Sequence, residues 1–182
     1  MQRRENLTHL ILANIVVFVL TLLMVCVDAQ ARIAFASERD GNWQIYVMAN
    51  DGDNQRNLSN NDFDDQYPSW SPDGKHIAFV SEREGSRDIY VMDADGGNPQ
   101  NLTKNRRNDW NPSWSPDGKR IAFVALRGNM EIYVMDADGK NSRKLTKNPH
   151  DDTDPAWYNP AFAVAPAGKT LTIWGRLKQV DR

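Results

Sequence analysis

One segment of this chain occurs twice at a fixed spacing. The sequence SWSPDGKHIAF at residues 69–79 returns as SWSPDGKRIAF at residues 113–123, which is 44 positions further on. Matching apolar runs begin at Ile33, Ile77 and Ile121. A repeat of about 40–45 residues is typical of folds built by stacking one structural unit on the next. The third copy lacks one residue, and the deletion falls in a loop, where a structural repeat tolerates a change in length.

The hydrophobic pattern inside one period predicts four short β-strands. Apolar runs are interrupted by turn sequences about every 8–12 residues. Ser-Pro-Asp-Gly at residues 115–118 and Asp-Ala-Asp-Gly at residues 136–139 predict tight turns, because proline presets the first turn angle and glycine accepts a positive φ. In the last full period, we expect strands over residues 112–115, 120–125, 131–136 and 142–146.

Four strands that become more polar toward the last describe one blade of a β-propeller. A β-sandwich has strands at the same spacing, but it does not require the same turn and tryptophan at a fixed register. We therefore predict an all-β fold, a β-propeller built of four-stranded antiparallel blades. The blades are expected at about residues 32–67, 68–111 and 112–154, with a closing strand at residues 155–158.

The repeat is out of phase with the chain. Arg32 begins a second strand, whereas residues 155–158 match an innermost strand and are expected to complete the blade that Arg32 begins. This arrangement gives about three blades, and closed propellers have four to eight. We therefore expect a partial or open propeller, whose ring is incomplete in one chain.

The first 31 residues differ from the repeats. Arg3 and Arg4 precede an apolar run at residues 10–27, and Ala29 and Ala31 offer the small side chains of a cleavage site. This pattern is typical of a secretory signal peptide, and the run is also just long enough for a membrane-spanning helix. We predict that this segment is a signal peptide or a membrane anchor and that the rest of the chain is exported, to the periplasm or outside the cell.

Composition excludes several classes of function. The chain has 22 basic and 24 acidic residues, so it offers no basic field for a nucleic acid backbone. Its only cysteine, Cys26, lies in the apolar run, so no disulfide supports the repeats. His76 and His150 do not form a metal-binding pair, and no serine lies in a nucleophile elbow. We predict a protein that is not an enzyme and has no metal or cofactor.

Two aspartate-rich turns resemble the beginning of a calcium loop. They start at Asp93 and Asp136, but Lys104 and Lys147 stand where such a loop needs its closing glutamate. We interpret both segments as hairpin turns.

The loops between blades contain the best candidate binding site. Asp65, Asp109 and Asp152 align just before the innermost strand, on the face that the loops after the second strand share. A ring of carboxylates with interspersed arginines fits a cation, a basic peptide end or a polar partner. The alternative is that each aspartate only caps a turn. The predicted binding residues are Asp62, Asp64, Asp65, Asp109, Trp110, Asp151, Asp152, Asp154, Arg39, Arg83, Arg127 and Trp43.

The tryptophans fall into two groups. Trp70, Trp114 and Trp157 recur at one register, which favours packing between blades over stacking on sugar rings. Trp43 and Trp110 have no counterparts in the other repeats, and we expect them in loops that contact a partner.

The sequence PSWSPDGK, followed by IAFV, IYVMDADG and NLT, resembles the TolB-like β-propeller repeat. This WD-repeat-like unit is found in periplasmic TolB and in the propellers of tricorn-type and prolyl-oligopeptidase-type peptidases. The resemblance extends from Ile33 to Trp157 and implies an exported propeller that binds protein or peptide partners. Residues 159–182 depart from the pattern, and we predict a degenerate strand or tail there.

These observations favour a non-enzymatic binding scaffold in the cell envelope or outside the cell, whose ring is completed by self-association. Membrane contact is expected only through the N-terminal segment, if it is not cleaved. The alternative is the propeller fragment of a prolyl-oligopeptidase-type or tricorn-type hydrolase that gates substrate. A third hypothesis, a sugar-binding lectin propeller, requires Trp43 and Trp110 to be exposed on one face.

Overall fold

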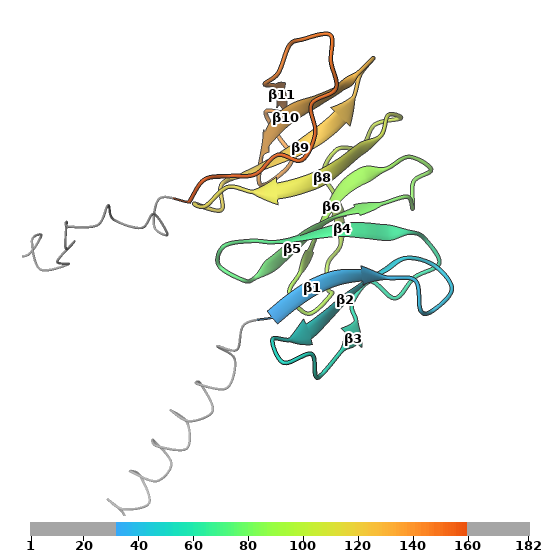
Figure 1. Ribbon diagram of the computed structural model, residues 1–182. Helices are drawn as coiled ribbons and strands as arrows, with labels where there is room; N and C mark the ends of the chain where they lie inside the picture. The colour runs from blue at the N-terminus through green and yellow to red at the C-terminus, as the bar shows by residue number, and fades with distance from the viewer. Residues whose placement is uncertain (1–31, 160–182) are drawn as a thin grey trace, which may run out of the picture.

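The computed structural model describes residues 32–159, and in this range the chain is all β-structure without a helix. Three antiparallel sheets lie one above another, and the chain passes through them in order (Figure 1). The first sheet has three strands, and the other two have four each. The predicted all-β fold with about three stacked blades is therefore confirmed. The expected signal or anchor segment and the tail after residue 159 lie outside the described residues.

The strands keep their chain order within each sheet, and each pairs with the next in antiparallel fashion. No helix in residues 32–159 is long and apolar enough to cross a membrane. The strands are β1 (Arg32–Ser37), β2 (Gln44–Ala49) and β3 (Arg56–Asn57) in the first sheet; β4 (Asp65–Trp70), β5 (His76–Ser81), β6 (Asp88–Asp93) and β7 (Gln100–Asn101) in the second; and β8 (Asp109–Trp114), β9 (Arg120–Leu126), β10 (Met130–Asp136) and β11 (Arg143–Lys144) in the third.

The outermost strands are shorter than predicted. In the third sheet β11 has two residues, although we expected five over residues 142–146. The reason is a side chain that replaces the backbone: the N–H of Ile132 donates to Thr146 Oγ1 at 3.0 Å, where a longer strand would offer a carbonyl. Thr103 and Ser59 accept the same bond in the other two sheets.

The innermost strands begin earlier than predicted. In the third sheet β8 starts at Asp109 instead of residue 112, and its register shifts between Trp110 and Ser113. Asn111 lies inside this bulge with a φ of 50°, a conformation that asparagine tolerates better than most residues. Trp110 therefore lies in a strand and packs against the core, so its predicted place in a loop is wrong.

The hydrophobic core lies between neighbouring sheets. Phe79 and Phe123, in the middle strands of the second and third sheets, are at most 1% exposed. Trp114 packs in one cluster with Ala78 and Val80 of the preceding sheet. Trp70 packs in the same way against the cluster that includes the first sheet. The predicted packing of these two tryptophans between blades is confirmed.

Glycines in the turns after β6 and β10 bring the second and third sheets close to the preceding sheet. A Cβ on Gly96 would lie 2.6 Å from the carbonyl oxygen of Leu58, and one on Gly139 would lie 2.8 Å from that of Leu102. Gly52 holds the same place in the first repeat, but a Cβ there would meet nothing within 4 Å. The φ angles of these glycines are all positive, so the three sites differ only in their surroundings.

This difference predicts unequal effects of alanine at equivalent positions. Gly52→Ala should lower the free energy of unfolding by about 1–2 kcal/mol, the cost of a positive φ. Gly96→Ala adds a backbone clash and should lower it by about 1–3 kcal/mol more. Urea unfolding of the two variants as single chains, at low protein concentration, measures both losses. Equal losses would contradict the close contact between the Gly96 turn and the first sheet.

The stack has two open ends. The first sheet begins with β1 and has no innermost strand among the described residues. Ile33 in β1 is therefore 42% exposed, whereas its equivalents Ile77 and Ile121 are fully buried. At the other end, residues 151–159 form no regular strand and lie beside β8, where Trp157 Nε1 donates to the carbonyl oxygen of Ser113 at 3.0 Å.

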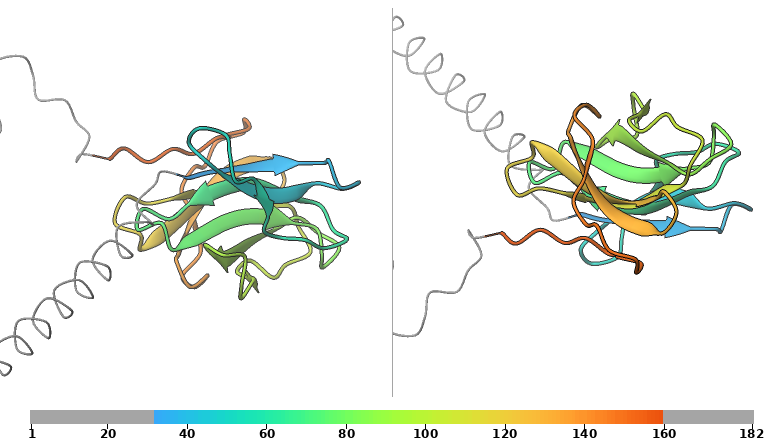
Figure 2. Two further views of the ribbon diagram at one scale, coloured as in Figure 1. Left: turned by 90° about the horizontal axis from the view of Figure 1, so that it is seen from below. Right: turned by 90° about the horizontal axis from the view of Figure 1, so that it is seen from above.

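The expected closing strand at residues 155–158 therefore does not complete the first sheet within one chain. Two sheets separate this segment from β1 (Figure 1). Figure 2 shows that β1 and the last described residues nevertheless lie on the same long side of the stack, the side of the innermost strands β4 and β8.

Candidate functional site

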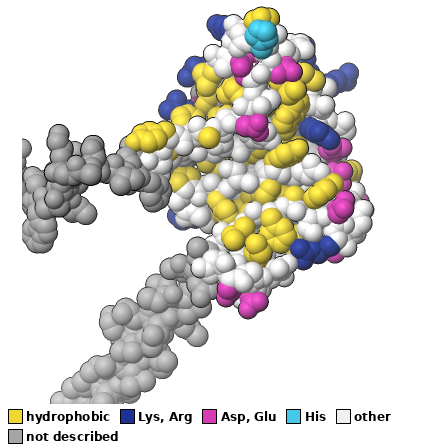
Figure 3. Space-filling view, viewed as in Figure 1, with side chains coloured by type: hydrophobic (Ala, Val, Ile, Leu, Met, Phe, Trp, Pro, Cys, Tyr) yellow, Lys and Arg dark blue, Asp and Glu magenta, His cyan; other side chains and the backbone are white. Residues whose placement is uncertain are grey.

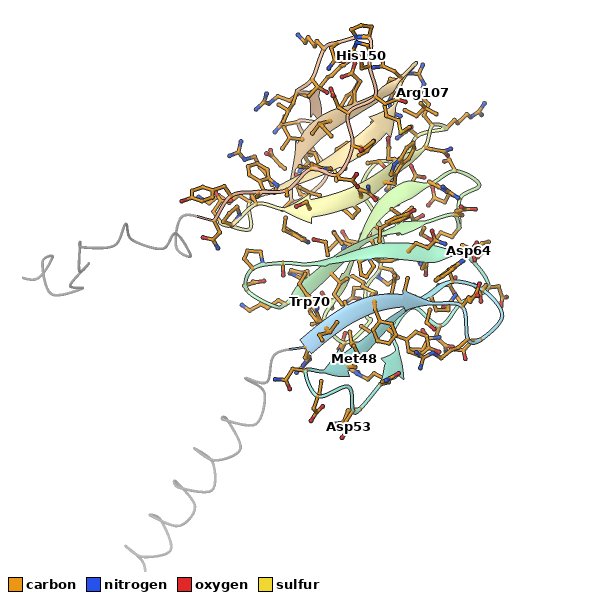
Figure 4. All side chains as sticks on the ribbon, viewed as in Figure 1. Met48, Asp53, Asp64, Trp70, Arg107 and His150 are labelled. Carbon is orange, nitrogen blue, oxygen red and sulfur yellow. The ribbon has the colours of Figure 1, made fainter. Side chains whose placement is uncertain are left out.

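We call one side of the stack the loop face. It consists of two kinds of loop. The first kind follows the outermost strand of each sheet, at residues 58–64, 102–108 and 145–151, and the second kind follows β1, β5 and β9. Asn42, in one loop of the second kind, donates to the carbonyl oxygen of Phe63 at 2.6 Å, which joins the two kinds of loop. Asp64, Arg107 and His150 lie along this side in Figure 4, and Trp70 lies on the opposite side.

A buried ion pair anchors each complete blade under the loop face. Asp109 is 0% exposed, and its carboxylate accepts a bond from Arg127 Nη2 at 2.7 Å and one from Asn105 Nδ2 at 2.6 Å. Burial raises the pKa of Asp109, and the bonds from Asn105 and Arg127 offset part of that rise. Asp65 and Arg83 form the same pair in the second sheet, at 3.1 Å.

The arginines of the loop face lie on aromatic rings. The guanidinium of Arg83 lies 4.6 Å from the ring centre of Tyr90, and that of Arg39 lies 4.4 Å from Tyr46. Tyr90 donates its hydroxyl proton to Glu84 at 3.1 Å. In the second sheet, this stacking holds the guanidinium of Arg83 in place with its donor edge toward the innermost strand β4.

Tyr90 provides a pH probe of this arrangement. Burial and the hydrogen bond to Glu84 raise the pKa of Tyr90 to about 12. Because folding favours the neutral phenol, the stability that this group contributes is complete below pH 10 and is lost as the pH rises toward 12. Absorbance titration of the tyrosines should show one group that ionises near pH 12 and disappears in Tyr90→Phe. Glu84→Gln should lower its pKa, and no change would contradict the bond.

The loops between sheets share one constant part, which we call the frame: an asparagine and the aspartate four residues later. Each loop presents a different pair of residues between them. At the frame positions, Asn61, Asn105 and Asn148 each donate to the aspartate four residues later, at 2.6 Å in all three loops. The two positions that follow each asparagine are exposed and differ from loop to loop. They are Asp62 and Phe63, Arg106 and Arg107, and Pro149 and His150.

Some predicted site residues hold the loops and strands together and do not form part of an exposed binding surface. Asp65 and Asp109 are buried in their ion pairs. Asp64 and Asp151 tie loops together, because their carboxylates accept the N–H groups of residues 43 and 130 at 3.0 and 2.8 Å. Asp154 accepts a bond from Asn111 and lies at the level of the innermost strands. Aspartates therefore do not form a continuous exposed ring.

The loop face is hollowed between the second and third sheets. A pocket of about 400 Å³ is lined by Arg106, Arg107, Arg127, Tyr133 and neighbouring residues. Arg106 and Arg107 were not among the binding residues predicted from the sequence. An alignment of the loops on their asparagines and aspartates places them at the positions of Asp62 and Phe63. Trp43 lies half-buried beside the first loop.

Grooves of about 700 and 750 Å³ lie on the opposite side, at the hairpin turns. Their carboxylates are engaged within their own turns. Asp73 and Asp117 each accept a bond from the serine two residues earlier, at 2.7 and 2.6 Å, which lowers the pKa of both groups. Asn98 donates to Asp93 at 2.7 Å. These residues stabilise turns, so we place the candidate site on the loop face.

Comparison with known proteins identifies the family. The model of the TolB beta propeller domain matches residues 28–127. The chain belongs to the TolB β-propeller family. A search of curated proteins gives no match.

Solved structures agree with this assignment. The putative TolB from Agrobacterium tumefaciens is 31% identical, with a TM-score of 0.65 over 69% of this chain and 46% of that one. TolB from Acinetobacter baumannii is 28% identical, with a TM-score of 0.59 over 69% of this chain and 32% of that one. A puromycin hydrolase, 13% identical with a TM-score of 0.59 over 73% of this chain and 22% of that one, shares the fold alone. This TolB-like chain therefore spans less than half the length of these relatives.

Proposed function

We propose that this TolB-like propeller is a non-enzymatic binding scaffold that recognises protein or peptide partners through its loop face. The observation that carries the proposal is the set of exposed residue pairs that differ between otherwise equivalent loops. Repeat proteins recognise partners in this way, with a constant frame and variable residues on one surface. The mixture of acidic, apolar and basic pairs suits a polypeptide, which offers all three kinds of side chain.

The chemistry of the loops suggests how such a polypeptide is bound. Arg106 and Arg107 line the pocket with Arg127, which favours a carboxylate of the partner there. Phe63 is 47% exposed and offers an apolar anchor on the neighbouring loop. Asp62, also exposed, favours a basic group beside it.

The proposal includes export and self-association. The similarity to TolB supports a place in the periplasm or outside the cell, with residues 1–31 as signal peptide or anchor. Fractionation of cells that express the tagged full chain tests it, and recovery in the cytosol would contradict it. A hydrolase fragment has weaker support, because the peptidase propellers share only the fold. The lectin hypothesis loses support because Trp110 packs against the core.

Selection from a random peptide library displayed on phage tests partner binding. We expect the full chain to enrich peptides that contain both an acidic and an apolar residue. The double change R106A with R107A should weaken their binding at least about tenfold, which corresponds to about 1.4 kcal/mol. The matched control is K119A with K140A, which removes two exposed positive charges from the opposite face. No enrichment, or equal losses in the two double variants, would contradict the proposal.

A further inference from the structure

The open edge of β1 lacks what the other sheets have. In the second sheet, the innermost strand β4 pairs with β5 and covers Ile77, which is fully buried. The equivalent Ile33 in β1 is 42% exposed. Figure 3 shows hydrophobic side chains over this lower end of the stack, with a basic side chain beside them. A strand in the position of β4 would cover this edge.

Residues 152–157 form no strand, but they share two backbone features with the innermost strands β4 and β8. Asp154 has a φ of 55°, as Tyr67 and Asn111 have 56° and 50° in the bulges of β4 and β8. The N–H of Asp152 donates to the carbonyl oxygen of Met130 at 2.9 Å, which matches the bond from Asp109 to Arg87 at 2.7 Å. The segment is thus held against the third sheet, where the innermost strand of a following sheet would lie. No second strand lies beside it among the described residues.

Each open end also holds one half of an ion pair. In the complete third sheet, Asp109 Oδ2 accepts from Asn105 and Oδ1 accepts from Arg127. The equivalent Asp152 accepts from Asn148 through Oδ2, and its Oδ1 has no donor among residues 32–159. Because Asp152 is repeated from Asp109, its missing partner is an arginine in the position of Arg127.

That arginine is present at the other end of the stack. Arg39 stands in the position of Arg83, and its Nε donates to Ser37 Oγ at 2.9 Å as that of Arg83 donates to Ser81 Oγ at 2.8 Å. Arg39 Nη1 donates to Gln55 at 2.8 Å, and its Nη2 has no acceptor within the described range. Arg83 Nη2 instead holds the carboxylate of Asp65. The two ends are therefore complementary in shape and in charge.

We propose that two copies of this chain associate head to tail, so that residues 152–157 of each copy pair with β1 of the other. The pairing is antiparallel and places Asp152 opposite Ser37, Ala156 opposite Ala34 and Trp157 opposite Ile33. This register is the one that β4 adopts on β5 and β8 adopts on β9. Asp152 of one copy forms the ion pair with Arg39 of the other. The proposal deepens the self-association in the proposed function and does not depend on partner binding.

Ring size supports a second copy as the occupant. With the borrowed strand each copy completes three four-stranded blades, and two copies make six, inside the range of closed propellers. One copy closed on itself would have three, which is below that range. The interface is head to tail, and a two-fold rotation closes it after two copies.

Disulfide trapping of the full chain tests the proposed register. In a C26S background, the single variants A34C and A156C are oxidised separately and after mixing. We expect covalent dimers only in the mixture, because each junction needs one cysteine from each end. The double variant S69C with A78C is the matched control, since these residues are paired in β4 and β5 and should form a disulfide within one chain.

The outcomes separate the possible occupants of the β1 edge. If the control oxidises and the mixture gives no dimer, the proposal is overturned. It is also overturned if a chain with both A34C and A156C forms its disulfide only within one copy. Dimers from either single variant alone would indicate a different, symmetric contact. None of these results depends on the peptide library, so this proposal and the binding proposal fail separately.

Exchange of the two charges tests the ion pair. R39D and D152R should each raise the dissociation constant of the dimer at least about tenfold. The combination of both changes should restore it to within about threefold, because the pair is reversed but kept. A double variant as weak as the single variants would show that Arg39 and Asp152 do not meet.

Discussion

Replacing Phe123 with alanine lowers the free energy of unfolding by about 3–5 kcal/mol. Phe123 is 1% exposed, belongs to the core between the second and third sheets, and lies 5.8 Å from the ring of Tyr133. Removing it leaves a cavity between two stacked sheets, and the rigid strands on either side cannot close it fully. Urea unfolding at a fixed protein concentration measures the loss.

Phe35 is the matched control for this change. It holds the same position of the repeat and contacts Tyr46 at 5.7 Å, but it lies in the end sheet and is only partly buried. At protein concentrations low enough to keep the chains single, where no partner covers the first sheet, Phe35→Ala should therefore cost less than Phe123→Ala. Equal losses would show that the third sheet is no better packed than the open end.

Replacing Arg127 with methionine lowers the free energy of unfolding by about 3–5 kcal/mol near neutral pH, because it leaves the buried carboxylate of Asp109 without its ion pair. The double variant D109N with R127M removes both charges and should recover most of the loss. Urea unfolding of the wild type and the two variants measures both effects. If the double variant is no more stable than R127M, the loss comes from packing and not from the uncompensated charge.

The loss in R127M depends on pH with a defined sign. Burial already raises the pKa of Asp109, and removing the guanidinium raises it further. Below the usual value of 3.8, the group is neutral in both the folded and the unfolded chain, so it contributes no penalty. Above the raised pKa, folding must bury the charge. The difference between R127M and wild type should therefore shrink as the pH falls toward 4, and a difference that grows would contradict this assignment.

The repeat of turns and apolar runs was enough to predict the stacked sheets, because each turn chemistry recurs at one spacing. It was not enough to place strand ends. A hydroxyl at Thr146 takes the place of a strand carbonyl, and a bulge at Asn111 extends β8 past a proline. Both depend on hydrogen bonds between residues far apart in the sequence, which hydrophobic periodicity does not record.

The sequence was enough to predict which loops share one face, but not which of their residues are exposed. A binding site was predicted in the loops between blades, and the structure brings those loops to one face. All the aspartates of these loops were predicted to bind a partner, because a sequence does not show which side chains are buried. Asp65 and Asp109 are buried ion-pair partners, whereas Asp62 is exposed. Arg106 and Arg107 lie between residues that recur in every loop, so a search for recurring residues did not select them.

The central claim is that two copies of this chain close one ring. Sedimentation equilibrium of the full chain, in a detergent matched in density by the solvent, measures the mass of the protein alone. We expect a particle with twice the mass that the unfolded chain has in denaturant, and a shift toward the single mass in R39D. A cooperatively folded particle of single mass, unchanged up to high protein concentration, would contradict it.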